Sequence, residues 1–185
     1  MIFAVLFTTV NGSSERYAKA ISAALDVPAY PVPRAPDLSG KDILYVGWVL
    51  SGKVTGLGEA AKKGNIRAVA AVGMAPVNPK TEDLYREMNP ELQGKVLFCL
   101  QGAFHKKGLP FLLRIQVSGA LKGAARQLQA LKASRELTES EQRFLDTVTT
   151  GEGEPLSWDG VNEVIDWARE QQQILPSETA PAEEP

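Results

Sequence analysis

The stretch that decides the fold covers residues 2–14 and reads Ile2-Phe3-Ala4-Val5-Leu6-Phe7-Thr8-Thr9-Val10-Asn11-Gly12-Ser13-Ser14. A short apolar run stops at hydroxyl and amide side chains around one glycine. A helical pattern begins at once, because Tyr17, Ile21 and Leu25 recur at intervals of about one helical turn. A strand, a loop of small residues and a helix in this order point the helix N-terminus and several backbone N–H groups at one spot. Such a spot attracts anions, phosphate above all.

The loop after this first strand contains no lysine or arginine, and this absence distinguishes between the known types of phosphate-binding loop. A P-loop nucleotidase needs Gly-x-x-x-x-Gly-Lys-Ser/Thr, and the first lysine after Gly12 is Lys19, more than one turn into the helix. A dinucleotide-binding fold needs Gly-x-Gly-x-x-Gly, and this loop has one glycine. Two interpretations remain open: a phosphate held by backbone dipoles and hydroxyl groups, or an ordinary strand–helix turn with a Ser/Thr cap.

Length and composition indicate one domain of ordinary globular type, with 185 residues and a formal net charge of -2. A net charge this close to neutral does not indicate nucleic-acid binding, and we expect no nucleic acid among the partners. Cys99 is the single cysteine, and we weigh a buried thiol in a strand against a redox role. One histidine and one cysteine predict no conventional metal site. The N-terminal apolar run is too short for a signal peptide and no run has membrane-spanning length, which predicts a cytoplasmic protein.

Four further apolar runs alternate with helical patterns, at residues 29–33, 43–48, 67–74 and 95–101. The first of these contains Pro31 and Pro33 and therefore suits only an edge strand, since proline cannot donate to a central ladder. Near-continuous apolar strands separated by helices are typical of a parallel sheet covered on both faces. We predict an α/β fold: a three-layer, doubly wound sandwich with a five-stranded parallel sheet in the order 2-1-3-4-5.

Ligands of such sheets bind beyond the carboxyl ends of the strands, where the strand order reverses. Three loops that contain glycine follow predicted strands, at residues 8–14, 47–53 and 101–105. We expect these loops to converge on one flat ligand that the backbone can approach closely.

These residues resemble the flavodoxin family, whose phosphate loop is commonly written Ser/Thr-x-Thr-Gly-Asn-Thr. The corresponding residues are Thr9-Val10-Asn11-Gly12-Ser13-Ser14, in which Asn11 replaces Thr and Ser13 replaces Asn. The resemblance extends over about residues 1–115, through Tyr45-Val46-Gly47-Trp48, Val72-Gly73-Met74 and Phe98-Cys99-Leu100-Gln101-Gly102. It is closest to a branch with an extended C-terminal half, although the third loop lacks the family's common acidic segment with tyrosine.

The resemblance implies FMN as the cofactor, with its phosphate in the first loop and its isoalloxazine ring between the second and third. The residues implied at FMN are Thr8, Thr9, Asn11, Gly12, Ser13 and Ser14 in the first loop, Gly47, Trp48, Val49, Leu50 and Ser51 in the second, and Gln101, Gly102, Ala103 and Phe104 in the third. Trp48 and Phe104 are expected beside the ring, although Trp48 also suits a core position under the second loop. His105 suits either the ring edge or the surface.

The implied function is electron transfer between FMN and a redox partner protein, and no catalytic residue is expected because the cofactor carries the chemistry. Two alternatives remain open. One is a flavin-dependent oxidoreductase linked to quinone or porphyrin, because menaquinone-dependent protoporphyrinogen oxidases also resemble flavodoxins with a long insertion near the flavin. The other is a flavodoxin-like domain that binds no flavin and acts through protein contacts.

Residues 105–150 are expected to add a helical segment to a domain that ends near residue 175, before a disordered tail at residues 176–185. Between residues 105 and 135 the chain has seven lysines and arginines and no acidic residue. Helical spacing places Val117, Leu121, Ala124, Leu128 and Leu131 on one face and Lys122, Arg126 and Gln129 on another. The basic face is either a solvated surface or a docking surface for an acidic partner or anionic lipid. Thr138-x-x-Glu141 predicts a capping box that opens the next helix.

Overall fold

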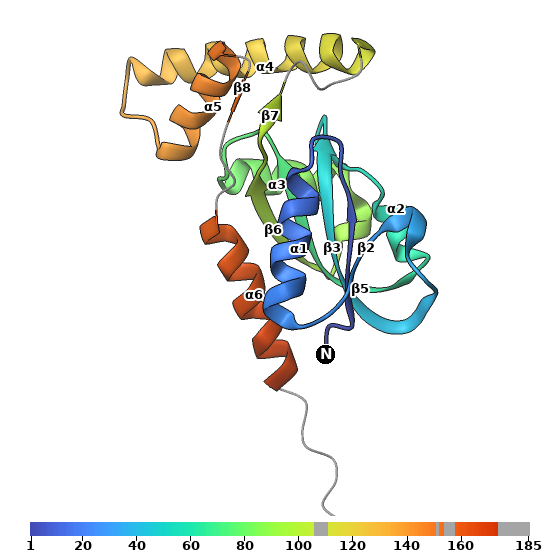
Figure 1. Ribbon diagram of the computed structural model, residues 1–185. Helices are drawn as coiled ribbons and strands as arrows, with labels where there is room; N and C mark the ends of the chain where they lie inside the picture. The colour runs from blue at the N-terminus through green and yellow to red at the C-terminus, as the bar shows by residue number, and fades with distance from the viewer. Residues whose placement is uncertain (106–110, 151, 154–157, 174–185) are drawn as a thin grey trace, which may run out of the picture.

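The computed structural model describes residues 1–105, 111–150, 152–153 and 158–173 (Figure 1). Its main sheet contains five parallel strands in the spatial order β2 (Ala29–Pro31), β1 (Ala4–Thr8), β3 (Leu38–Leu50), β5 (Gly64–Gly73) and β6 (Val96–Gln101). The predicted α/β fold and its flavodoxin-like order 2-1-3-4-5 are therefore confirmed. The proline-containing strand β2 lies at the edge, as expected. A short strand that was not predicted, β4 (Lys53–Val54), folds back antiparallel onto the end of β3.

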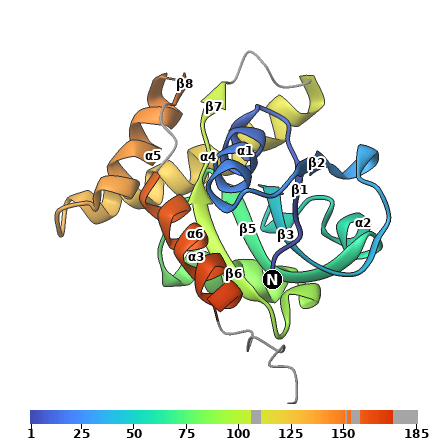
Figure 2. The same ribbon diagram turned by 60° about the horizontal axis from the view of Figure 1, so that its bottom comes forward.

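Helices cover both faces of the sheet. On one face lie α1 (Ser13–Leu25) and α6 (Trp158–Gln173), which are side by side in both views (Figures 1 and 2). The core on the other face contains side chains from α2 (Leu57–Ala61) and α3 (Pro79–Met88). In β1, Val5 and Phe7 belong to the α1–α6 core, whereas Ala4 and Leu6 belong to the opposite core. Successive side chains of a strand point to opposite faces, so burial on both faces explains the near-continuous apolar runs.

Single 3-10 turns connect the elements after β2 and after α3, at η1 (Val32–Arg34) and η2 (Pro90–Leu92). Asn78 caps α3, since its side chain accepts a hydrogen bond from the Thr81 N–H at 3.0 Å. Strand β3 begins five residues before the apolar run at Ile43, because Leu38 pairs with Gly64 across a register shift. The polar residues between them gave no strand signal.

The segment after β6 forms a helical hairpin across the carboxyl end of the sheet (Figure 1). Its helices are α4 (Phe111–Lys132) and α5 (Glu139–Thr150), and β7 (Phe104–His105) pairs with β8 (Glu152–Gly153) beside them. The hairpin has a small core of its own, formed by Ala125, Leu128, Phe144 and Leu145. The predicted capping box is confirmed: the Thr138 hydroxyl accepts from the Glu141 N–H at 3.3 Å, and the Glu141 carboxylate accepts from the Thr138 N–H at 2.9 Å.

The two faces predicted for α4 are largely confirmed. Lys122, Arg126 and Gln129 are exposed and Leu128 is buried, but Leu131 is exposed and does not belong to the hairpin core. The backbone of Arg114 is described, but its side chain is not, and the same holds for Val117. Lys106, Lys107 and the expected tail at residues 176–185 lie outside the described residues. None of the described helices combines the length and the apolar composition that crossing a bilayer requires.

Candidate functional site

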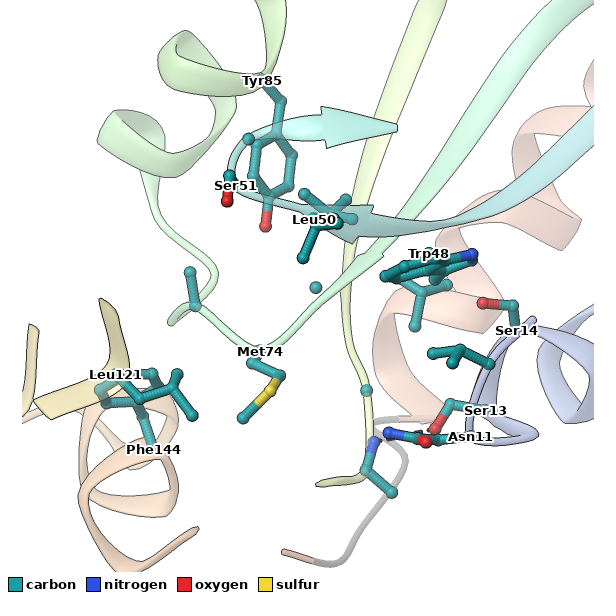
Figure 3. Close-up of a pocket in the computed structure, with 18 of the residues that line it drawn as sticks. Asn11, Ser13, Ser14, Trp48, Leu50, Ser51, Met74, Tyr85, Leu121 and Phe144 are labelled. Carbon is teal, nitrogen blue, oxygen red and sulfur yellow. Dashed lines mark hydrogen bonds between the residues drawn. The ribbon is translucent and has the colours of Figure 1, made fainter. Parts of the chain in front are cut away.

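A cavity of about 250 Å³ lies at the carboxyl edge of the sheet, between the ends of β1, β3, β5 and β6 and the α4–α5 hairpin (Figure 3). Its volume is slightly below the roughly 300–1,000 Å³ of typical small-molecule sites. The lining residues are Thr9, Val10, Asn11, Ser13, Ser14, Trp48, Val49, Leu50, Ser51, Gly52, Val72, Gly73, Met74, Ala75, Pro76, Leu84, Tyr85, Gly102, Ala103, Leu121, Ala124 and Phe144. None of these described residues is charged. The cavity lies where the strand order reverses, as expected for this sheet.

The polar end of the cavity is the loop between β1 and α1. Gly12 has a left-handed backbone (φ 82°) and starts α1, and no side chain caps this helix. The Gly12 N–H donates to the Thr9 hydroxyl at 2.9 Å, which closes the loop. The N–H groups of the first helical turn therefore have no side-chain acceptor and, with the helix dipole, favour an anion. A Cβ on Gly12 would meet no atom within 4 Å, so glycine is required here by its backbone conformation rather than by lack of space.

The two serines of this loop differ in their partners. The Ser13 hydroxyl accepts a hydrogen bond from the Ala103 N–H at 3.0 Å and ties the first loop to the loop after β6. Ser14 is 1% exposed, and its hydroxyl has no hydrogen-bond partner. Every other fully buried side-chain N or O atom of the described residues has one. Figure 3 shows this hydroxyl on the side of Ser14 that faces Trp48. An unsatisfied buried hydroxyl costs about 1–3 kcal/mol, and a ligand that accepts its hydrogen bond would remove that cost.

The second wall is the end of β3 and its turn into β4. Trp48 is half-buried, lines the cavity and belongs to neither sheet core, so the structure does not make it a core residue. Ser51 and Gly52 both have left-handed backbones and form the turn. Asn89, which is buried, holds this turn: it accepts from the Val54 N–H at 2.8 Å and donates to the Gly52 carbonyl at 2.8 Å. The wall is therefore fixed in place by a side chain from the C-terminal end of α3.

The third wall was missed by the sequence reasoning. It is the segment Met74, Ala75 and Pro76, which follows β5 at the same edge of the sheet. Ligands of parallel sheets bind beyond the carboxyl ends of the strands, and β5 is one of these strands. The sequence therefore contained a signal for this third wall. Gly73 lies against Tyr85, since a Cβ on Gly73 would be 2.1 Å from the Tyr85 hydroxyl oxygen. This contact brings α3 against the cavity.

The apolar end of the cavity is formed by Leu50, Met74 and Leu84 together with side chains of the helical hairpin, namely Leu121, Ala124 and Phe144 (Figure 3). The hairpin is anchored beside the cavity through Ser140, whose hydroxyl accepts from the Val77 N–H at 2.9 Å. Sequence periodicity identified Leu121 and Ala124 as an apolar helix face but could not say what that face covers.

Ten of the fifteen residues expected at FMN line the cavity: Thr9, Asn11, Ser13, Ser14, Trp48, Val49, Leu50, Ser51, Gly102 and Ala103. Gly12 shapes the first loop through its backbone, as described above. The side chain of Phe104 is not described, and neither is that of His105.

The other three expected residues have packing roles. The Thr8 hydroxyl lies 2.7 Å from the Tyr45 hydroxyl and donates to the Thr55 carbonyl at 2.8 Å. A Cβ on Gly47 would lie 2.6 Å from the Tyr45 ring. The Gln101 side chain contacts Ser140 of α5 at 3.4 Å.

Cys99 lies on β6, away from the cavity lining, and packs against the α2–α3 core. It is half-buried, and burial raises the pKa of its thiol to about 11. The thiol is therefore protonated at neutral pH, which favours the packing interpretation over a redox role.

No family model, no curated protein and no solved structure matches this chain.

Proposed function

We propose that this chain is an FMN-binding electron-transfer protein of the flavodoxin type, acting in the cytoplasm. The observation that carries the proposal is the polar end of the cavity, where an uncapped helix N-terminus meets the unpaired, buried Ser14 hydroxyl. A phosphate monoester accepts several hydrogen bonds at once and is stabilised by the positive end of a helix dipole. The rest of the cavity is apolar and suits a flat, uncharged ring.

The donor set fits a phosphate that is bound without a cationic side chain. Backbone N–H groups of the first turn and the hydroxyl of Ser14 would donate to it, and Thr9 and Asn11 lie at the same end of the cavity. When bound, FMN supplies reversible electron transfer through its ring. The chain itself binds the phosphate, positions the ring between Trp48 and the segment after β5, and limits the access of water.

The redox partner in this proposal is an acidic protein that docks on the exposed basic face of α4, which carries Lys122 and Arg126. The opposite face of the same helix lines the cavity through Leu121 and Ala124. A partner on the basic face would therefore be separated from the cavity by about one helix diameter, roughly 10–12 Å. Binding of anionic lipid vesicles instead of an acidic protein would assign this face to a membrane surface.

A second candidate, a flavin-dependent oxidoreductase acting on a quinone or a porphyrin, is favoured by one observation. The α4–α5 hairpin places Leu121, Ala124 and Phe144 on the cavity. Apolar cover that excludes water is useful to an enzyme that must protect a reacting substrate, whereas a simple electron carrier has less need of it.

The deciding experiment is purification of the full chain followed by FMN titration, monitored by flavin absorbance and fluorescence. We expect binding of one FMN per chain and a clear preference for FMN over riboflavin, which lacks the phosphate. Reduction by a flavodoxin reductase without substrate turnover indicates the electron carrier, and turnover with a quinone indicates the second candidate. A protein that stays colourless with added FMN would point to a domain acting through protein contacts alone.

Substitution of Gly12 links this binding to the first loop. Gly12→Val introduces a β-branched residue at a left-handed position and strains the loop that would hold the phosphate, so we expect FMN binding to be lost. Gly12→Asn is the matched control for backbone strain, because asparagine tolerates this conformation. Unchanged FMN affinity in Gly12→Val would place the phosphate elsewhere.

A further inference from the structure

One polar side chain, that of Tyr85, reaches the apolar end of the cavity. Tyr85 comes from the second half of α3, is 3% exposed and lines the cavity. Figure 3 shows its hydroxyl oxygen pointing away from α3, into the space beside Leu50. Its carbonyl accepts from the buried Asn89 amide at 2.6 Å, so the helical turn that carries the side chain is held in place.

The hydroxyl of Tyr85 differs from those of two other buried tyrosines, Tyr17 and Tyr45. The Tyr17 hydroxyl donates to the Gln101 carbonyl at 2.6 Å, and the Tyr45 hydroxyl bonds to Thr8 and to the Thr55 carbonyl. The Tyr85 hydroxyl makes no hydrogen bond within the part of the chain that the structure describes. Buried tyrosine hydroxyls usually have a partner, so a phenol directed into a cavity without one points to a partner supplied by a ligand.

The surroundings of this hydroxyl define the ligand's chemistry. The neighbouring lining residues Leu50, Met74, Leu84, Leu121 and Phe144 carry no charge and cannot donate a conventional hydrogen bond. A charged group here would lose its hydration without compensation. Methionine and phenylalanine favour contact with flat rings. Burial and the nearby Cys99 raise the pKa of Tyr85, so its phenol remains a hydrogen-bond donor at neutral pH.

We infer that the apolar end of the cavity binds a planar, uncharged ring that bears a carbonyl group, and that Tyr85 donates a hydrogen bond to that carbonyl. The inference rests on the proposed function in one respect: the isoalloxazine ring, which has two carbonyl groups on its pyrimidine part, is the expected occupant. Tyr85 thereby becomes a ring-binding residue, distinct from Ser14, which serves the phosphate.

The test compares the affinities of riboflavin and FMN for the full-length protein and for Tyr85→Phe. Tyr85→Phe keeps the ring and removes only the hydroxyl, so the fold is expected to persist; far-UV circular dichroism and the melting temperature check this. One hydrogen bond contributes about 0.5–1.5 kcal/mol. We therefore expect Tyr85→Phe to bind both flavins about 3- to 10-fold more weakly than the parent protein, with the same factor for riboflavin and for FMN. The matched control, Ser14→Ala, is expected to weaken FMN and leave riboflavin unchanged.

A second readout separates a hydrogen bond from packing. Infrared spectra of bound riboflavin should show a carbonyl stretching band at higher frequency in Tyr85→Phe than in the parent protein, because the donor has been removed. An unchanged carbonyl spectrum would overturn the inference even if the affinity fell.

The outcomes also separate this inference from the proposed function. If Ser14→Ala weakens FMN but Tyr85→Phe changes neither affinity, the inference is wrong and the proposed function stands. If FMN binds no more tightly than riboflavin and Tyr85→Phe weakens both, the inference stands and the phosphate assignment fails. If neither flavin binds to the parent protein, both are overturned.

Discussion

Replacement of Ser14 by alanine is the sharpest test of the cavity's polar end, because it should change stability and binding in opposite directions. In the ligand-free protein the Ser14 hydroxyl is buried and has no partner. Removing it abolishes a desolvation cost of about 1–3 kcal/mol, and alanine also has the higher helix propensity, by up to about 0.5 kcal/mol. Since a small cavity is left behind, we expect the free energy of unfolding to rise by about 1 kcal/mol.

Ser13→Ala is the matched control, one residue away in the same loop. The Ser13 hydroxyl accepts from the Ala103 N–H at 3.0 Å, so its removal leaves that N–H without its partner. We expect this variant to lose about 1 kcal/mol of stability, because it loses a hydrogen bond and leaves a part-buried donor without its partner. The two serine variants should therefore differ in the sign of their effect on stability.

The binding arm of this prediction uses FMN and riboflavin. A hydrogen bond to a charged group contributes about 1.5–3 kcal/mol, and 1.4 kcal/mol corresponds to a factor of ten in affinity. Ser14→Ala should therefore weaken FMN about 10-fold or more and leave riboflavin unchanged.

The assays for the serine pair are urea unfolding followed by circular dichroism and flavin titration followed by fluorescence. A change in the unfolding midpoint at constant slope reports a change in stability. If Ser14→Ala destabilises the ligand-free protein by about 1 kcal/mol or more, its hydroxyl has a partner there, contrary to the structure. If riboflavin and FMN bind more weakly by the same factor, Ser14 does not contact the phosphate.

Three further predictions concern other parts of the molecule. The pKa of the Glu141 carboxyl is lowered to about 2 because Arg135 donates two hydrogen bonds to it and the Thr138 N–H another. This stabilisation is therefore fully present above about pH 4.5, the ordinary range of a glutamate, and is lost as the pH falls towards 2. Glu141→Gln should lower the melting temperature at pH 7, and the difference from the parent should shrink towards zero by pH 2; a constant difference would contradict the assignment. Trp48 should quench the fluorescence of bound flavin, so Trp48→Ala should make bound FMN brighter, and unchanged emission would show that the indole is not next to the ring. Reversing the charges of Lys122 and Arg126 together should change the free energy of unfolding by less than about 0.5 kcal/mol per site and should slow electron transfer most at low salt, where steering is least screened; a large loss of stability would show that this face is buried.

Features that depend on neighbouring residues could be predicted from the sequence. Apolar runs bounded by glycine and proline marked the parallel strands, and the prolines at positions 31 and 33 marked the edge strand. The capping box of Thr138 and Glu141 and the cap of Asn78 depend on residues three positions apart, so they too could be predicted. The flavodoxin-like strand order was expected because it places the proline-containing strand at an edge of the sheet.

Which of these residues form a site depends on the long-range packing of the chain and could not be predicted from the sequence. Tyr85, Leu121 and Phe144 have the spacing of ordinary core residues, and nothing local shows that they meet at one cavity. Asn89 ends α3, and its side chain also holds the turn after β3, which lies far away in the sequence. Whether a hydroxyl such as that of Ser14 or Tyr85 is paired depends on atoms far away in the sequence. A hydrogen-bond deficit is a property of the packed chain, so it becomes visible only once the long-range contacts are known.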